Sequence, residues 1–187
     1  MCKDTDGRIW LGTSIGISLL RNGVVDPSVD VRYGTVSSIA SYDGDRLLVM
    51  IRNSLYLMDK KTLAMSLIWQ DDSVVIGKVC LTDDGHVWIY DQLAPVIYIL
   101  DDGFALVDII ELPCRGVNSV IEADGGQCFV STDNGLYLLD RSGRRLDLSD
   151  DLKKITRGEN VLFLTQNGSG SRCMGIRGKG IFVFDAY

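Results

Sequence analysis

The chain has 187 residues, enough for one ordinary domain with a substantial core. Its net charge of -6 argues against nucleic acid as the main partner, because binding a polyanion requires clustered Lys and Arg, and here the basic residues are scattered. No apolar run reaches the ~18–20 residues that cross a bilayer, so we expect no membrane insertion by this segment. Its 20 glycines against three prolines, among many apolar residues, favour short strands joined by tight turns.

The first strands are expected around a pattern that returns along the chain. An Asp-Gly turn at Gly7 precedes a short alternating strand that carries Trp10, and a second turn lies between Gly12 and Gly16. We call the glycine three residues before the bulky position the marker glycine. The marker glycines and their partners are Gly7 and Trp10, Gly44 and Leu47, Gly85 and Trp88, Gly126 and Phe129, and Gly170 and Cys173. This period of about forty residues is typical of a propeller blade.

Each copy predicts four strands. An apolar strand precedes most marker glycines, the marker strand follows, and a third strand comes next, over 17–20, 55–58, 96–100, 136–139 and 181–184. Outer strands are expected within 24–31, 63–69, 104–110 and 144–148. The predicted fold class is therefore all-β: a β-propeller segment of four-stranded antiparallel blades, part of a larger propeller of about seven blades. The segment 150–157 favours a single helical turn.

Two incomplete copies flank three full ones. The expected division is a partial blade over 1–32, blades over 33–74, 75–113 and 114–156, and a partial blade over 157–187. The first copy appears without an inner strand and the last without an outer one. We therefore expect a piece of a longer protein, with the remaining blades as its first partners.

The first copy resembles the two-component regulator propeller repeat. Its Asp6–Ile17 stretch follows that family's Asp-Gly turn, Trp-Ile-Gly-Thr and Gly-Leu pattern; 84–89 resembles the first half and 129–136 the second. The positions that carry the repeat are Gly7, Trp10, Gly12, Thr13, Gly16, Gly85, Trp88, Phe129, Thr132 and Gly135. The second, third and last copies depart from the pattern at 47–50, 90–91 and 173–176.

The resemblance implies a function. Such propellers form the extracytoplasmic sensor region of hybrid two-component histidine kinases, especially in gut Bacteroidetes. The resemblance implies a periplasmic, non-catalytic module that senses a glycan-derived small ligand and thereby controls polysaccharide-utilisation genes. It also implies that the module works together with the receptor's downstream domains and that the full receptor is a homodimer. No kinase pattern occurs in this chain.

Catalytic and metal motifs have simpler explanations. Gly12–Gly16 matches the G-x-S-x-G nucleophile elbow, but a strand follows it, and His86 is the chain's one histidine, at a turn position. Asp4-Thr5-Asp6-Gly7 is half of a calcium loop, so turn-forming aspartates are the better interpretation. We predict no catalytic residues, no metal site and no cofactor. The sequon at 167–169 indicates an Asn-Gly turn.

Aromatic and cysteine residues leave the ligand site unassigned. Trp10 and Trp88 could stack on a sugar, but their place in the repeat favours packing between neighbouring blades. Tyr33 and Trp69 are better candidates for a recognition surface, although outer-strand packing is favoured for both. The five cysteines, which show no metal-ligand spacing, are expected as inert thiols, with a disulfide as the alternative.

Two other functions remain open. A propeller lyase or glycosidase would need paired carboxylates at a defined separation. A scaffold of the WD-repeat kind would carry Gly-His and Trp-Asp pairs, which the copies lack.

Overall fold

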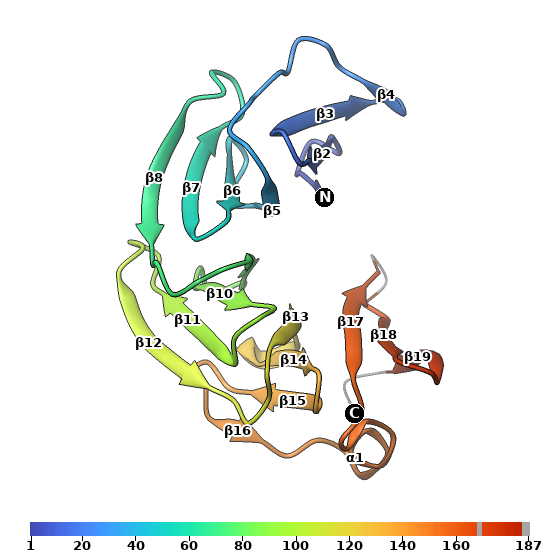
Figure 1. The fold of residues 1–187 in the computed structure, drawn as a ribbon. Coiled ribbons are helices and arrows are strands. Elements are labelled where there is room, and N and C mark those ends of the chain that lie inside the picture. Colours follow the sequence, from blue (N-terminus) through green and yellow to red (C-terminus); the bar gives the residue numbers. More distant parts are fainter. Residues whose placement is uncertain (168–169, 185–187) are drawn as a thin grey trace. The chain divides into compact units, whose positions relative to one another are not determined.

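The fold consists of five small antiparallel sheets, seen in a computed structural model that describes residues 1–167 and 170–184 (Figure 1). Four sheets have four strands, and the last has three among the described residues. Neighbours in the chain are neighbours in each sheet, which is the arrangement of a propeller blade. The expected all-β class with four-stranded antiparallel blades is therefore confirmed.

The strands of each sheet are as follows. The first sheet comprises β1 (Cys2–Lys3), β2 (Ile9–Gly12), β3 (Ile17–Arg21) and β4 (Val24–Val25). The second comprises β5 (Val36–Ser41), β6 (Arg46–Ile51), β7 (Ser54–Asp59) and β8 (Met65–Gln70). The third comprises β9 (Gly77–Leu81), β10 (Val87–Asp91), β11 (Val96–Leu100) and β12 (Leu106–Glu111). The fourth comprises β13 (Val117–Glu122), β14 (Cys128–Thr132), β15 (Gly135–Leu139) and β16 (Arg145–Leu146). The fifth comprises β17 (Val161–Gln166), β18 (Arg172–Ile176) and β19 (Gly180–Phe184).

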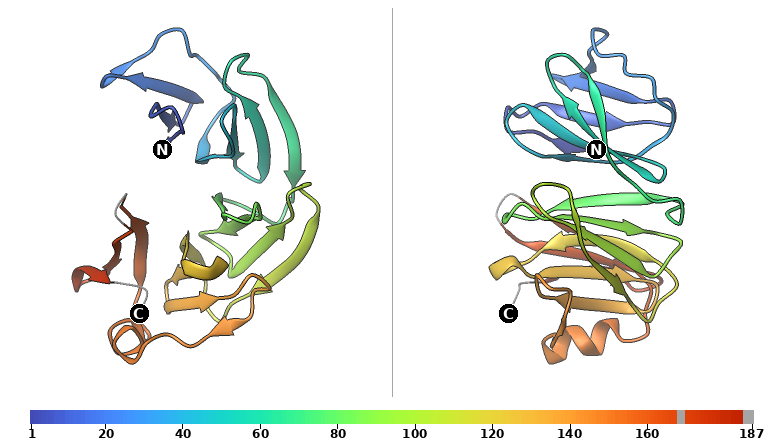
Figure 2. Two further views of the ribbon diagram at one scale, coloured as in Figure 1. Left: turned by 180° about the vertical axis from the view of Figure 1, so that it is seen from behind. Right: turned by 90° about the vertical axis from the view of Figure 1, so that its left-hand side faces the viewer.

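Two details at the ends of the chain differ from expectation. The first sheet does have an inner strand, since β1 pairs with β2 through Cys2 opposite Trp10. A strand of two residues is too short to show any periodicity, so it could not be predicted from the sequence pattern. Helix α1 (Asp150–Thr156), labelled in Figure 1 and seen as the orange coiled ribbon in Figure 2, has seven residues rather than one turn. The Ser149 hydroxyl caps its N-terminus by accepting from the Leu152 N–H.

The second copy is offset by one residue from the predicted repeat. Leu47 lies opposite Ser41, as Ile9 lies opposite Lys3 in the first sheet. Leu48, and not Leu47, therefore corresponds to Trp10. The turn before it is closed by the Tyr42 N–H donating to the Arg46 carbonyl.

The chain divides into two compact units, Met1–Leu81 and Thr82–Tyr187. In the first, the face of the first sheet packs on the second through Trp10, Leu19, Val36, Ile39 and other buried residues. In the second, the fourth and fifth sheets share a core with Phe129, Leu164 and Met174. Phe129 and Phe184 meet edge to face at 5.3 Å. Bulky strand residues thus pack between neighbouring sheets within each unit.

Candidate functional site

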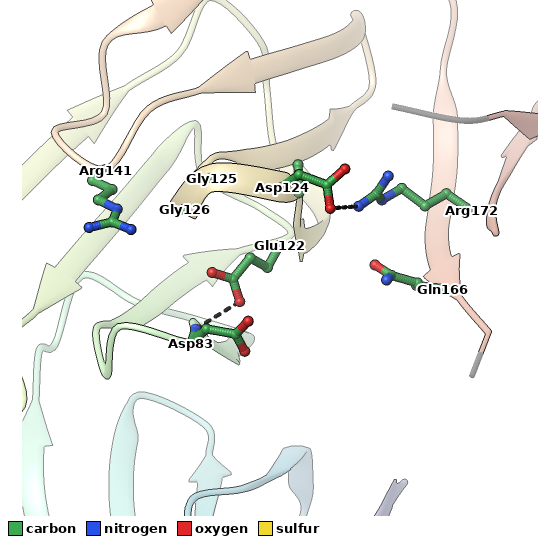
Figure 3. Close-up of a pocket in the computed structure, with 9 residues that line it drawn as sticks. Asp83, Glu122, Asp124, Gly125, Gly126, Arg141, Gln166 and Arg172 are labelled. Atoms are coloured by element: carbon green, nitrogen blue, oxygen red, sulfur yellow. Dashed lines mark hydrogen bonds and ion pairs between the residues drawn. The ribbon is translucent and has the colours of Figure 1, made fainter. Parts of the chain in front are cut away.

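A polar pocket of about 480 Å³ lies in the second unit, at the edge where inner strands end and hairpin turns begin (Figure 3). Within the described chain it is lined by Asp83, Glu122, Ala123, Asp124, Gly125, Gly126, Arg141, Gln166 and Arg172. Its side chains are almost all charged or hydrogen-bonding. Such a concave group of convergent polar residues is the usual form of a ligand site.

The repeat explains how these residues come together. Glu122 and Gln166 are the last residues of the inner strands β13 and β17. These strands lie side by side, and the Asn118 amide donates to the Val161 carbonyl at 2.9 Å. Asp83 and Asp124 each precede a marker glycine by two positions. Successive copies therefore deliver equivalent residues to the same edge.

Arg172 is the residue that departs from the repeat. It lies opposite Gln166, the last residue of β17. In three other sheets the residue at this position is apolar or weakly polar: Ile9, Leu47 and Cys128. Arg172 is therefore a charged residue at a position where the other copies carry small or aliphatic groups. Departures of this kind from a repeat pattern are often found at functional sites.

The surroundings of Arg172 leave part of its hydrogen-bonding capacity unused. The residue is 5% exposed, and its Nη2 lies 3.2 Å from Asp124 Oδ1. This ion pair is one of the dashed lines in Figure 3. Its guanidinium carbon stands 5.8 Å from the centre of the Phe129 ring. Its Nε is buried without a hydrogen-bond partner among the described residues. An unsatisfied buried donor is costly, and a ligand acceptor would remove that cost.

The opposite wall of the pocket is acidic. Glu122 Oε2 accepts a hydrogen bond from the Asp83 N–H at 2.8 Å. Burial, and then the nearby charges of Asp83 and Asp84, raise the pKa of Glu122, although the bond from Asp83 opposes this. The proton affinity of this carboxylate therefore depends on what occupies the pocket.

Arg141 closes the acidic side. Its Nε lies 3.3 Å from Asp84 Oδ2, which ties the turn of the fourth sheet to that of the third. A Cβ at Gly126 would lie 2.0 Å from this Nε, and Gly126 has φ +73°. The left-handed backbone favours glycine at this turn, and any side chain here would displace the exposed Arg141 guanidinium.

The chemistry of the lining suits a ligand rich in hydroxyl groups. Each hydroxyl both donates and accepts a hydrogen bond. The carboxylates of Asp83, Glu122 and Asp124 supply acceptors, while Arg141, Arg172 and the Gln166 amide supply donors. Charged partners make such bonds shorter and stronger than neutral ones. No group of three or more His, Cys, Asp or Glu that could hold a metal occurs in the described ranges.

The predicted repeat positions lie elsewhere, in the cores and turns. Trp10, Trp88 and Phe129 are each 1% exposed, on the second strands β2, β10 and β14. Gly7 and Gly85 adopt φ +79° and +87° in their turns, and a Cβ on Gly12 would lie 2.7 Å from Val36 Cγ1. None of the ten positions lines this pocket.

The Thr-Gly turns share one design. Thr13 Oγ1 donates to the Gly16 carbonyl at 3.0 Å, and Thr132 Oγ1 donates to the Gly135 carbonyl at 3.0 Å. A Cβ on Gly16 would lie 1.8 Å from the Val31 carbonyl oxygen, so no other residue fits. These positions build the blade.

The other motifs and residues that the sequence analysis weighed as possible sites can now be placed in the structure. Ser14 lies in the hairpin between β2 and β3, and no helix follows it, so the nucleophile-elbow context is absent there. His86 Nδ1 lies 3.1 Å from Asp84 Oδ1, and its side chain is about one third exposed rather than fully exposed. Tyr33 is exposed, whereas Trp69 on β8 is half-buried. The turn expected at 167–169 falls partly outside the described residues.

Asp4 is a turn residue, as predicted, and it also accepts hydrogen bonds from the side chains of Arg8 and Trp10. Its Oδ1 accepts from the N–H groups of Asp6 and Arg8, while its Oδ2 accepts from Trp10 Nε1 at 2.9 Å and Arg8 Nε at 2.9 Å. Lys60 Nζ, also buried, lies 3.7 Å away. The half calcium loop is thus a buried anchor for the tryptophan.

Sequence reasoning did not single out Glu122, Arg141 or Arg172. The available signal was the comparison of copies, since Arg172 stands where other copies carry Ile9 or Cys128. All five cysteines lie in the described part of the chain, and none of them is in a disulfide there. Among the described residues, helices fall short of the length and apolarity that a membrane crossing requires.

Comparisons with known proteins give structural similarity only. No family model matches the chain, and no curated protein matches its sequence. A structure described as the extracellular domain of a hybrid two-component system, BT4673 from B. thetaiotaomicron, matches with a TM-score of 0.71 and 17% identity over 95% of this chain. A second structure of the BT4673 extracellular domain, described as a one-component system, gives 0.70 and 15% over 97%.

The computationally designed Ika4 protein matches with a TM-score of 0.63 and 11% identity, over 85% of this chain and 96% of its own. The chain spans 25% of each of the two BT4673 structures. At these identities the likeness shows the fold: this chain has the architecture of part of those extracellular domains.

Proposed function

We propose that this chain is part of the extracytoplasmic sensor region of a hybrid two-component histidine kinase of the two-component regulator propeller family. Two observations support the proposal: the repeat at 6–17 and the structural similarity to extracellular domains of a two-component system. On this proposal the segment is periplasmic and non-catalytic. The full receptor would be a homodimer. Its remaining blades and its downstream domains would transmit the signal that controls polysaccharide-utilisation genes.

The ligand proposed for the polar pocket is a small glycan-derived molecule. The observation that carries this assignment is Arg172, a buried arginine with an unused Nε donor at a position that is apolar in other copies. Opposed acceptors and donors within one pocket match the hydroxyl groups of a sugar. A ligand held by turns of three successive copies would favour one arrangement of those turns, which is how binding shifts a receptor between states.

Substitution of Arg172 tests the ligand site. Arg172→Leu puts an apolar side chain in the buried position, and folding should be retained because the partner left behind, Asp124, is exposed and stays solvated. Binding of a glycan-derived oligosaccharide, identified by calorimetry against a panel, should fall at least about tenfold, or about 1.4 kcal/mol.

The matched control is Arg177→Leu, since Arg177 is exposed in the β18–β19 hairpin outside the pocket. It should bind as the unmodified protein does. Equal binding by the Arg172→Leu protein would remove the pocket from the proposal. Cleavage of a glycan by the intact protein, lost in Glu122→Gln, would replace the sensor with an enzyme.

A further inference from the structure

A second pocket, of about 610 Å³, lies in the same unit at the other end of β14. Strand β14 joins the turn at 123–127, which borders the first pocket, to the Thr132–Gly135 turn, which borders the second. Within the described chain it is lined by Pro113, Asn134, Gly135, Leu136, Tyr137, Arg145, Leu148, Lys153, Thr156, Arg157 and Gly158. Three of these residues are basic and none is acidic.

The three cations come from separate elements. Arg145 belongs to β16, Lys153 to α1, and Arg157 follows that helix. Lys153 lies 3.1 Å from Asp147 and 3.9 Å from Asp150, but both carboxylates are almost fully exposed, so water and salt screen them. Arg157 forms no ion pair with a described residue. The pocket is thus locally positive in a chain of net charge -6.

Helix stabilisation does not account for the whole arrangement. Basic residues in a last turn favour the helix dipole, which explains Lys153 and its neighbour Lys154. It does not explain Arg145, whose guanidinium stacks over the Tyr137 ring at 4.6 Å. Stacking on an aromatic face holds a guanidinium in one orientation and leaves its edge available for an anion.

Tyr137 adds a neutral hydrogen-bond donor to the lining of the pocket. The residue is 5% exposed, yet its hydroxyl makes no hydrogen bond within the described residues. Burial raises the pKa of Tyr137, so the hydroxyl stays protonated and able to donate at neutral pH. Its oxygen is not one of the buried polar atoms that lack a partner, so water reaches it, and a ligand acceptor would take the place of that water.

We infer that this pocket binds an oxyanion, a carboxylate or sulfate group carried by a small organic ligand. Arg145 and Arg157 would hold its oxygens by charge-assisted hydrogen bonds, with Lys153 as a further charge and Tyr137 as a neutral donor. This site is separate from the polar pocket and does not depend on the proposed function.

The test measures binding of three probes to the intact protein by calorimetry: glucuronate, glucosamine 6-sulfate and neutral glucose. The two anionic probes should bind with an affinity that falls as salt rises, and glucose should not bind here. A preference between the two tells which oxyanion the site takes; either preference supports the inference. Arg157→Gln should weaken anionic binding about tenfold, the effect of one lost charged hydrogen bond.

Lys154→Gln is the matched control, because it removes an equal charge one turn away, from helix α1 and outside the pocket. It should change anionic binding less than about twofold. Glu122→Gln, in the other pocket, should also leave it unchanged. The inference is overturned if the intact protein binds neither anion at millimolar concentration, or if Arg157→Gln and Lys154→Gln lose binding equally.

Discussion

Two hairpin turns at the same place in the repeat, 4–8 and 123–127, use their aspartates in opposite ways. Asp4 is buried, and both of its oxygens are occupied by Arg8, Trp10 and the turn backbone, with Lys60 nearby. Asp124 is exposed, and it forms an ion pair with Arg172 from another sheet. In the first turn, the carboxylate of Asp4 therefore stabilises the fold.

The difference teaches how one repeat serves both stability and recognition. A carboxylate whose acceptor sites are filled from its own turn has no capacity left for a ligand. In the 123–127 turn the equivalent position of Asp4 is Ala123, so the acid has moved one residue along and faces a pocket. The same backbone turn therefore becomes part of a site.

Breaking the anchored turn should have the largest effect. Asp4→Ala leaves the Trp10 indole N–H without its acceptor and removes the carboxylate that pairs with the buried Lys60 ammonium, which keeps only its hydrogen bond to the Asp43 carbonyl. We expect a loss of about 3–5 kcal/mol in the free energy of unfolding, the usual result of removing one partner from a buried ion pair. Urea unfolding followed by tryptophan fluorescence measures this. Asp6→Ala, which removes the exposed ion-pair partner of Arg8, should cost less than about 1 kcal/mol; equal losses would contradict the comparison.

The second prediction concerns the glycines of the open turn. Gly125 and Gly126 have φ +74° and +73°, so alanine at either should cost about 1–2 kcal/mol of stability through the left-handed conformation. Only at Gly126 does the new Cβ meet Arg141; nothing lies within 4 Å of one at Gly125. Gly126→Ala should therefore also weaken ligand binding in the polar pocket, measured by calorimetry. Equal weakening by Gly125→Ala would show that Arg141 is not involved.

The third prediction is a difference in pH dependence. Burial opposes ionisation of Asp4, but the bonds from Trp10 and Arg8 outweigh it, so its pKa lies below the ordinary 3.8. Its contribution to stability is therefore present above pH 3.8 and lost as the pH falls through the lowered value. Thermal unfolding below pH 3.8 should show the loss, and Asp4→Asn should show less of it.

Glu122 should behave in the opposite sense. Its pKa is raised above 4.5 in the folded state, so stability is lost as the pH rises from 4.5 through the raised value. Because the side chain is partly exposed, Glu122→Gln should raise the melting temperature near neutral pH by no more than about 2 °C. A fall in melting temperature at neutral pH would contradict this.

The last prediction concerns cysteine reactivity. Burial raises the pKa of Cys2 and of Cys114 to about 11, against an ordinary 9.0. The thiolate fraction near neutral pH is then about a hundredfold lower, and alkylation by iodoacetamide should slow accordingly. Mass spectrometry of the folded protein, with urea-unfolded protein as control, measures the ratio. Equal rates in both states would contradict the burial of these thiols.

Much of the fold could be predicted because its signals are local. The marker glycines and alternating apolar residues act within one turn or one strand, so Trp10, Trp88 and Phe129 could be assigned to matching strands from spacing alone. The errors arose where a signal was short or shifted: β1 has two residues, and the turn at 42–46 moves Leu48 into the expected place of Leu47.

The candidate site was beyond this kind of reasoning. Within a single copy of the repeat, nothing marks Glu122, Gln166 or Arg172 as functional. They line a common pocket only because β13 lies beside β17. The Asp4–Lys60 pair likewise joins turn residues that follow strands of two different sheets, β1 and β7.

By itself, the sequence determined the strand order, the turns and the all-β class, because backbone conformation and apolar alternation depend on neighbouring residues. Only the tertiary structure decided which charges are satisfied and which face a pocket. That outcome depends on the packing of one sheet against the next, which brings together side chains some forty residues apart.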